Sequence, residues 1–435
     1  VVMHFPENES LPFERLVSDV DTAHQRLEVL STLAEDGERA PLVVASVAAV
    51  VQKTIAREVF RSTSHRLSRG ESVDLDELLD RWRRMGYQFE PTVYAPGYAS
   101  RRGGIVDIYP VGSDAPSRIE LWGNEIDSIR RFDPETQRST DVVESVLVGP
   151  AGETLPGLAE SDRLDRRMAV LDFANCTEPD RERIVHELGL LTDGHEIEEL
   201  QFYSGFFDEG SLLDYVAGDA LLVMHRPAEI AEAAWEAEER AHGLRETKQS
   251  RGELPHNFPS SHLEWQEVEE RVAEFRRRLE IMPWGAEHLV YDQVHVLPFA
   301  SPPAFLGKLD SFVEEAEELS GEGHRVVAVT SHSRRLGEIL ADRGVGATLP
   351  DSLTEPPDTG TVTVLRSEGA GLSDGFVLTV DGRRLVVLSD AEIFGVTKQR
   401  RTQRRTAARR DDFLSELSPG DYVVHVEHGI GRFAG

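Results

Sequence analysis

The chain has 435 residues, of which 40% are hydrophobic, enough for several packed cores and for roughly two to four domains. The 78 Asp and Glu residues outnumber the 47 Lys and Arg residues, and the formal net charge of −31 opposes non-specific binding to DNA. The single cysteine, Cys176, cannot form an internal disulfide and fits a reducing compartment. With no apolar run of about 18 residues and no secretory signal pattern, we expect a cytoplasmic protein with no membrane partner.

Both ends of the chain indicate a piece of something longer. The sequence begins at Val1 rather than Met, and it stops at Gly435 within a segment that is typical of a strand and turn. We therefore expect further polypeptide beyond these ends in the full protein.

Residues 1–56 are predicted to form the first part of an α/β domain. Ser18 or Asp19 can cap a helix whose apolar residues recur at helical spacing, namely Ala23, Leu27, Leu30 and Leu33. The apolar run at 42–44 is typical of a strand buried in a parallel sheet.

Residues 57–150 are predicted to form an inserted α+β module. A helix is expected over Leu75–Met85, with Gly86 ending it. Short strands separated by turn residues follow, at Gly104–Tyr109, Arg118–Trp122, Glu125–Arg130 and Val142–Val148.

Residues 151–297 return to an α/β pattern. An apolar strand is expected at Ala220–Met224, and Ala228–His242 and Trp265–Leu279 are expected to be long, charged helices. Thr247–Ser261 is predicted to be a loop. The simplest account is one α/β domain that the 57–150 module interrupts.

Residues 298–394 are predicted to form a second, small α/β domain. Helices are expected at Leu306–Leu319 and Ser333–Asp342, and strands at Arg325–Thr330, Thr361–Leu365 and Leu385–Leu388.

The composition changes after this domain. Residues 395–412 are predicted to be a basic linker, because 398–410 hold seven Lys and Arg residues and no acid. A solvated linker helix and a contact with a polyanion or an acidic partner both fit this segment. Residues 413–435, with a β-like stretch at Gly420–Phe433, are expected to be the truncated start of a further domain.

Two stretches partly match nucleotide-binding and nucleophile motifs, but neither satisfies its motif in full. Beside Gly307-Lys308, Pro302 stands where a P-loop needs its first glycine and Leu309 where it needs Ser or Thr. Gly371-Leu-Ser373-Asp-Gly375 matches a nucleophile elbow, but a second strand is expected at Phe376–Val380 in place of the required helix. We predict no catalytic residue and no bound cofactor in this chain.

A zinc site is not expected either. In the stretch 425–428, His425 and Glu427 would share one face of a strand, whereas His428 would point to the other. Ligands on opposite faces cannot close a tetrahedral site, so we predict no metal.

One surface attracts attention as a candidate binding site. Alternation along the strand Arg118–Trp122 places Arg118, Glu120 and Trp122 on one face, while Ile119 and Leu121 face the core. We therefore expect an Arg and a Trp side by side, facing outward. Arg and Trp are the residues most enriched at the energetic centres of interfaces, and Arg102 enters a neighbouring strand. On the pattern alone, burial of Trp122 under another part of this chain is an equal alternative.

In several of these stretches, the chain resembles the N-terminal portion of the bacterial transcription-repair coupling factors, the Mfd family, and it has a region similar to UvrB. The resemblance covers essentially all of the chain. It is carried by Phe5–Glu14, by Arg102–Pro110 with Arg118–Ile126 and Phe132-Asp133, by Ser389–Gly395, and by Val423–Phe433. The last two stretches are not shared with UvrB, and the final one resembles the start of the family's RNA-polymerase-interacting domain.

The resemblance implies a degenerate nucleotide-binding-like α/β domain that is interrupted by a module for binding UvrA. Arg102, Arg118 and Trp122 match the family's UvrA-contacting positions, and we regard Trp at the last of these as a conservative change. Where UvrB carries an acidic Walker B sequence, this chain has Leu222-Val-Met-His-Arg-Pro227. The ATP-driven motor of the family, with its ATP, Mg and main DNA contacts, is expected beyond residue 435.

Two other functions remain as alternatives. The chain could be a nucleotide-dependent DNA-remodelling enzyme of the UvrB type, which the missing Walker elements disfavour. It could also be a spacer whose truncated tail alone engages a partner, RNA polymerase.

Overall fold

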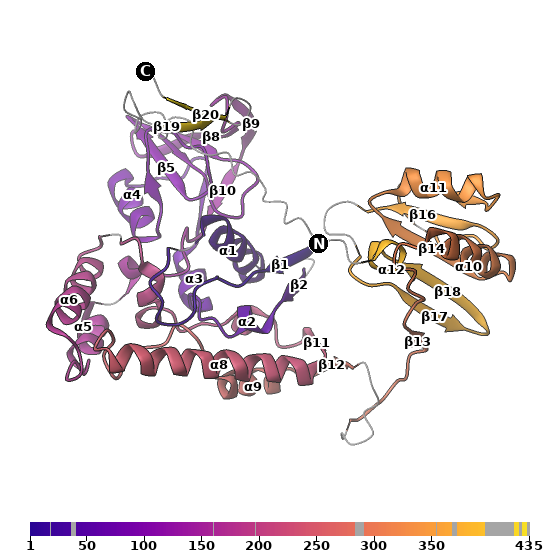
Figure 1. The fold of residues 1–435 in the computed structure, drawn as a ribbon. Coiled ribbons are helices and arrows are strands. Elements are labelled where there is room, and N and C mark those ends of the chain that lie inside the picture. The colour runs from indigo at the N-terminus through magenta and orange to yellow at the C-terminus, as the bar shows by residue number, and fades with distance from the viewer. Residues whose placement is uncertain are drawn as a thin grey trace. The chain divides into compact units, whose positions relative to one another are not determined.

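The computed structural model describes most of the chain as two compact units, residues 1–287 and 288–435, and each unit is described by itself. The described residues are 1–17, 19–35, 41–159, 161–195, 197–282, 291–353, 355–367, 372–395, 422–425 and 429–432. As expected at the coarse level, the protein is an α/β protein of more than one unit with several sheets (Figure 1).

The first unit contains helices and strands in mixed order. Its helices are α1 (Val20–Ala34), α2 (Val47–Val50), α3 (Arg57–Thr63), α4 (Leu75–Arg84), η1 (Pro156–Leu158), α5 (Ser161–Ala169), α6 (Glu178–Thr192), η2 (Leu200–Phe206), α7 (Leu212–Tyr215), α8 (Pro227–Ser250) and α9 (Trp265–Glu274). Its strands are β1 (Val2–Phe5), β2 (Leu42–Ala45), β3 (His65–Ser68), β4 (Gln88–Phe89), β5 (Tyr98–Arg102), β6 (Ile105–Ile108), β7 (Ser117–Trp122), β8 (Glu125–Phe132), β9 (Ser139–Val143), β10 (Ser145–Val148), β11 (Leu221–His225) and β12 (Arg277–Ile281).

The start of the chain folds as a parallel β1–β2 pair with α1 beside it. Asp19 caps α1, because its carboxylate accepts a hydrogen bond from the Thr22 amide. The strand predicted at 42–44 is confirmed as β2, but its predicted burial is wrong. Leu42 and Val44 are exposed, since only the alternate residues of β2 face the core.

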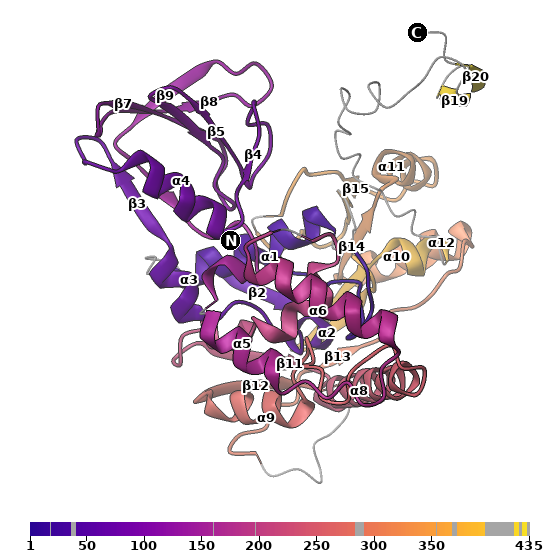
Figure 2. The same cartoon turned by 90° about the vertical axis from the view of Figure 1, so that its left-hand side faces the viewer.

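The inserted module is built on a six-stranded sheet in the order β4-β5-β6-β7-β8-β9. All neighbours are antiparallel except β4 and β5. Helix α4 lies across one side of this sheet (Figure 2), where Leu78, Leu79 and Trp82 enter the core. The predicted helix and its glycine stop are confirmed, with Gly86 at a φ of +88°.

A separate antiparallel pair, β3 and β10, carries the chain into and out of the module. The single strand predicted over Val142–Val148 is therefore wrong. The extended backbone is interrupted at Glu144. The strands on either side of it have different partners, since β9 pairs with β8 and β10 pairs with β3. Two side chains fasten this pair to the module, since Trp82 donates to His65 and Tyr87 donates to the Gly149 carbonyl.

Residues on both sides of the module share one core. Phe5, Leu27 and Phe60 precede the six-stranded sheet in sequence, whereas Leu155 and Tyr215 follow it, and all five belong to one buried cluster. The chain therefore returns to the same α/β body after forming the module.

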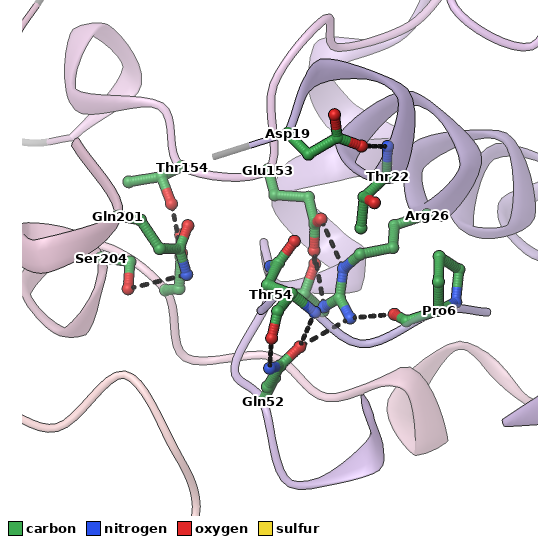
Figure 3. A network of polar contacts seen from close by, with 12 residues as sticks. Pro6, Asp19, Thr22, Arg26, Gln52, Thr54, Glu153, Thr154, Gln201 and Ser204 are labelled. Carbon is green, nitrogen blue, oxygen red and sulfur yellow. Dashed lines mark hydrogen bonds and ion pairs between the residues drawn. The ribbon is translucent and has the colours of Figure 1, made fainter. Parts of the chain in front are cut away.

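A buried charge network lies where the module rejoins this body (Figure 3). The fully buried guanidinium of Arg26 donates two hydrogen bonds to Glu153, at 2.6 and 3.0 Å, and others to the Pro6 carbonyl and Gln52. Thr54 donates to the same Glu153 carboxylate at 2.7 Å. The network around this ion pair thus joins four places in the sequence, at Pro6, Arg26, Gln52 with Thr54, and Glu153.

The remainder of the first unit differs from the sequence prediction at several boundaries. Helix α8 continues to Ser250, eight residues beyond the predicted end (250 − 242) and into the predicted loop. The helix predicted over Trp265–Leu279 ends at Glu274, and residues 277–281 form β12, which pairs in parallel with β11. Pairing with a strand 56 residues earlier in the chain (277 − 221) cannot be detected in a local pattern that also fits a helix.

The second unit contains one six-stranded sheet with helices. Its elements are β13 (Phe299–Ala300), α10 (Leu309–Gly321), β14 (Arg325–Thr330), α11 (Ser333–Asp342), β15 (Ala347–Thr348), β16 (Val362–Arg366), β17 (Phe376–Val380), β18 (Arg383–Leu388), α12 (Asp390–Phe394), β19 (Tyr422–His425) and β20 (Gly429–Arg432). The sheet order is β13-β17-β18-β14-β16-β15, with β15, β16, β14 and β18 parallel.

The helices of this unit contribute to one core. Phe312 of α10, Leu336 of α11 and Ile393 of α12 join a single buried cluster with Val326 and Ala328 of β14. The predicted strand at 325–330 and helix at 333–342 are confirmed at both ends. The first predicted helix begins three residues later than expected (309 − 306), because Leu306 and Gly307 have positive φ values.

Several predictions fall wholly or partly outside the described residues. The basic segment 398–410 lies outside them, as do Gly371 and His428. Near the end of the chain, β19 and β20 form an antiparallel pair. Across the described residues, none of the helices is both long and apolar enough to cross a membrane.

We predict that Glu153→Ala destabilises the first unit by about 3–5 kcal/mol, because it leaves the buried Arg26 charge without its partner. The measurement is the free energy of unfolding in urea, monitored through the hydrogen exchange of peptides from β3 and β10. Asp80→Ala is the control, since the Asp80–Arg84 pair is exposed and should contribute less than about 1 kcal/mol. A similar loss in the two variants would contradict a structural role for the buried pair.

We also predict that His262 makes the first unit less stable in acid. Burial, with the nearby charges of Arg26 and Lys53, lowers the pKa of His262 to about 4 from an ordinary value of 6.5. The pKa of His262 is lower in the folded state than in the unfolded state. Its contribution to the free energy of unfolding is therefore fully present above about pH 6.5 and decreases as the pH falls toward 4. Relative to His262→Gln, the wild type should lose about 2 kcal/mol between pH 7 and pH 5. Parallel stability curves for the two proteins over that range would rule out this effect.

Candidate protein-binding surface

The candidate surface is the outer face of β5–β8, the face opposite α4. Two tight hairpins set its register, pairing Arg102 with Ile105 and Trp122 with Glu125. Each hairpin has a two-residue loop whose first residue is a glycine with a positive φ, +65° at Gly103 and +62° at Gly123. Glycine is required there because side chains strain this backbone conformation.

Alternation along β7 separates core residues from surface residues. Ile119 is buried and Leu121 packs against the same core, together with Val106, Ile126 and Ile129 of the neighbouring strands. The alternate residues of β7, Arg118, Glu120 and Trp122, consequently lie on the outer face. This part of the sequence prediction is confirmed.

Trp122 is 86% exposed. Among the described residues of the first unit, no other segment covers its ring. It ends β7 immediately before the Gly123 turn, and the Leu121 amide next to it donates to the Gly104 carbonyl of the other hairpin. A large apolar ring held in water on a rigid strand is typical of a contact residue.

The two arginines of the surface meet at a residue that the sequence analysis missed. Asp107 of β6 is only 1% exposed and lies between the strands that carry them. Arg118 donates to its two carboxylate oxygens at 2.7 and 2.9 Å. Arg102 donates to Oδ2 at 2.7 Å. The signal in the sequence was an acid at an outward position of the intervening strand, but strand register is needed to use it.

Arg118 is more enclosed than the sequence pattern suggests. Its side chain is 17% exposed, stacks 4.8 Å from the centre of the Phe132 ring, and donates weakly to the Gln137 carbonyl. Hydrogen bonding to Asp107 raises its pKa, so the charge is permanent. The expectation that Arg118 and Trp122 face outward side by side needs correction, because Glu120 separates them along the strand and only Trp122 is freely exposed.

Glu120 belongs to a second small polar group on the same face. It accepts a hydrogen bond from Ser128 at 2.8 Å and lies 3.8 Å from Arg130 of β8. The surface therefore presents paired charges of both signs together with one exposed tryptophan ring.

The described residues offer little to hold a cofactor or metal. Among them no group of three His, Cys, Asp or Glu side chains is placed to bind a metal ion. Ser373 precedes β17, which pairs with β18 as a hairpin, and its carbonyl accepts a hydrogen bond from Ser389. The strand predicted at 376–380 is confirmed, and no helix follows Ser373 as an elbow would require.

Comparison with protein families first defines the kind of module that carries this surface. Residues 66–153 match the family described as the UvrB interaction domain, a range that contains the whole six-stranded sheet and ends at Glu153. Residues 417–435 match the family described as the CarD-like/TRCF RID domain.

Individual relatives extend this result over the whole chain. The transcription-repair-coupling factor of Bacillus subtilis is 31% identical over 100% of this chain, and that of Myxococcus xanthus is 30% identical over 100%. The protein of the same name from Staphylococcus haemolyticus is 28% identical, also over 100%. The chain spans only 37% or 38% of the length of these relatives. The resemblance to the N-terminal portion of transcription-repair coupling factors is thereby confirmed.

We predict that Trp122→Ala leaves the stability of the module within about 0.5 kcal/mol of wild type, since the ring is in water. Ile119→Ala, three residues away on the inner face, should cost about 2–5 kcal/mol by opening a cavity. Thermal unfolding of the two variants measures the difference. Comparable destabilisation by Trp122→Ala would mean that its ring packs within the protein. The outer face of β5–β8 would then no longer be a candidate binding surface.

Proposed function

We propose that this chain is the repair-recruitment portion of a transcription-repair coupling factor, and that it binds UvrA through the outer face of β5–β8. The observation that carries the proposal is the position of the exposed Trp122. It stands on the sheet that matches the UvrB interaction domain, on the same face as two arginines held by one buried carboxylate. Through UvrA, the protein brings nucleotide excision repair to stalled RNA polymerase.

The exposed arginine and tryptophan of this face favour a particular kind of partner surface. Arg102 is 55% exposed and keeps guanidinium edges toward solvent, so it suits a carboxylate or carbonyl group. Trp122 suits an apolar pocket. We propose that UvrA supplies an acidic group beside such a pocket.

The arrangement of domains in this proposal follows the resemblance. Residues 1–56 and 151–297 form a degenerate nucleotide-binding-like domain, which the module of residues 57–150 interrupts. The shared core on both sides of the module supports this division. Residues 298–394 form a small α/β domain, 395–412 a basic linker, and 413–435 the truncated start of a barrel that engages RNA polymerase, which the match at 417–435 supports.

We propose no catalysis for this chain. Strand β11 ends in Met224-His225, so it offers no carboxylate where a Walker B strand would hold Mg²⁺, and the sequence has no P-loop. In the full protein, ATP hydrolysis and most DNA contacts belong to a motor outside these residues. ATP turnover by the purified chain, with or without DNA, would instead favour the UvrB-like enzyme.

We predict that Trp122→Ala combined with Arg102→Ala weakens binding to purified UvrA by about 2–4 kcal/mol, or roughly 30- to 1000-fold. Isothermal titration of the whole chain is the measurement. Trp235→Ala is a matched control, because this tryptophan is 65% exposed but lies on α8, outside the module. Equal binding by the double variant moves the interface elsewhere, and no binding by the wild type refutes the adaptor function.

A further inference from the structure

The two arginines on the candidate surface are held in different ways. Arg118 uses two donors, Nε and Nη2, on Asp107, and its contact with the Phe132 ring covers one side of the guanidinium. Arg102 makes one hydrogen bond to the same carboxylate and is three times as exposed, 55% against 17%. Of the two, Arg102 has the donors and the access that a partner needs.

Asp107 is too buried to touch a partner itself. Its strand, β6, is flanked by β5 and β7, and the register sets Asp107 opposite Ser100 on one side and Arg118 on the other. Arg102 reaches Asp107 diagonally from the end of β5. The carboxylate is thus a fixed point that Arg118 shields from water and to which Arg102 is tied.

We infer that Asp107 is a positioning residue for partner binding: held by Arg118, it fixes the Arg102 guanidinium on the outer face that also carries Trp122. The inference rests on the proposed function, which it deepens by assigning roles within the surface. Arg102 and Trp122 contact the partner, whereas Arg118 acts mainly through Asp107.

Ordering before binding has a measurable benefit. An arginine that moves freely in the unbound protein loses its rotamer freedom when it binds, and this loss weakens the complex. An arginine already tied to Asp107 has lost that freedom in advance. Removing the tie should therefore weaken binding by about 2- to 10-fold.

Charge alone predicts the opposite result, which makes the test decisive. The cluster of Arg102, Arg118 and Asp107 carries a net charge of +1 (2 − 1), and Asp107→Asn raises it to +2. If the surface acted only by attracting an acidic partner, the variant would bind more tightly. If Asp107 positions Arg102, the variant binds more weakly despite its greater positive charge.

The experiment compares the whole chain with its Asp107→Asn variant in two measurements. The first is the affinity for purified UvrA by isothermal titration. The second is the NMR signal of the Arg102 Nε–H group in arginine-labelled protein, assigned with Arg102→Lys, which reports the mobility of that side chain. Val106→Ala controls for general destabilisation, because Val106 is buried on the inner face of the same strand.

We expect Asp107→Asn to bind UvrA about 2- to 10-fold more weakly and to mobilise Arg102, and Arg102→Ala to cost less in that background than in wild type. Val106→Ala should retain the affinity and the ordered Arg102 signal. Unchanged or tighter binding by Asp107→Asn overturns the inference, as does an equal loss in Val106→Ala. If the wild type does not bind UvrA, the proposed function fails, and an Arg102 that stays ordered in Asp107→Asn separately overturns the positioning role.

Discussion

The buried ion pair between Arg26 and Glu153 is the contact on which the arrangement of the first unit depends. Arg26 comes from the first long helix, whereas Glu153 is the last residue of the range that matches the UvrB interaction domain. A charge without access to water must be neutralised and hydrogen-bonded. Here the Glu153 carboxylate neutralises the guanidinium, and it accepts hydrogen bonds from it together with the Pro6 carbonyl and Gln52 Oε1. The pair therefore fixes where the chain leaves the module and re-enters the α/β body.

The module uses the same chemistry at its surface for a different purpose. There Asp107 is the buried group, and the two arginines that neutralise it lie between it and solvent. The sheet makes this possible because alternation sends Val106 and Ile108 into the core while Asp107 faces outward. An outward residue such as Asp107 can thus be buried by its own neighbours on the sheet.

Much of the fold follows from local sequence patterns. Helix α11 and strands β14 and β17 have the predicted ends, because turn residues bound each one and its apolar spacing fits a single structure. The patterns failed where a distant partner decides the outcome. Residues 277–281 fit a helix but pair with β11, and the run at 142–148 divides because β8 and β3 compete for it.

The candidate surface could be predicted in part for the same reason. Alternation along one strand correctly placed Trp122 outward, because that rule needs only neighbouring residues. The burial of Arg118 and the role of Asp107 depend on the register of three strands. That register cannot be read from local patterns in one sequence. The hairpin glycines indicated the turns but not which side chains those turns would bring together.

The pair of strands that connects the module to the body has a mechanical consequence. A single linker swivels about its own bonds, but β3 and β10 are hydrogen-bonded side by side and can twist only together. His65 and Gly149, one on each connecting segment, are further bound by Trp82 and Tyr87 of the module. Torsion between module and body is thereby resisted along two covalent paths, and a protein held on the outer face takes its orientation from the body.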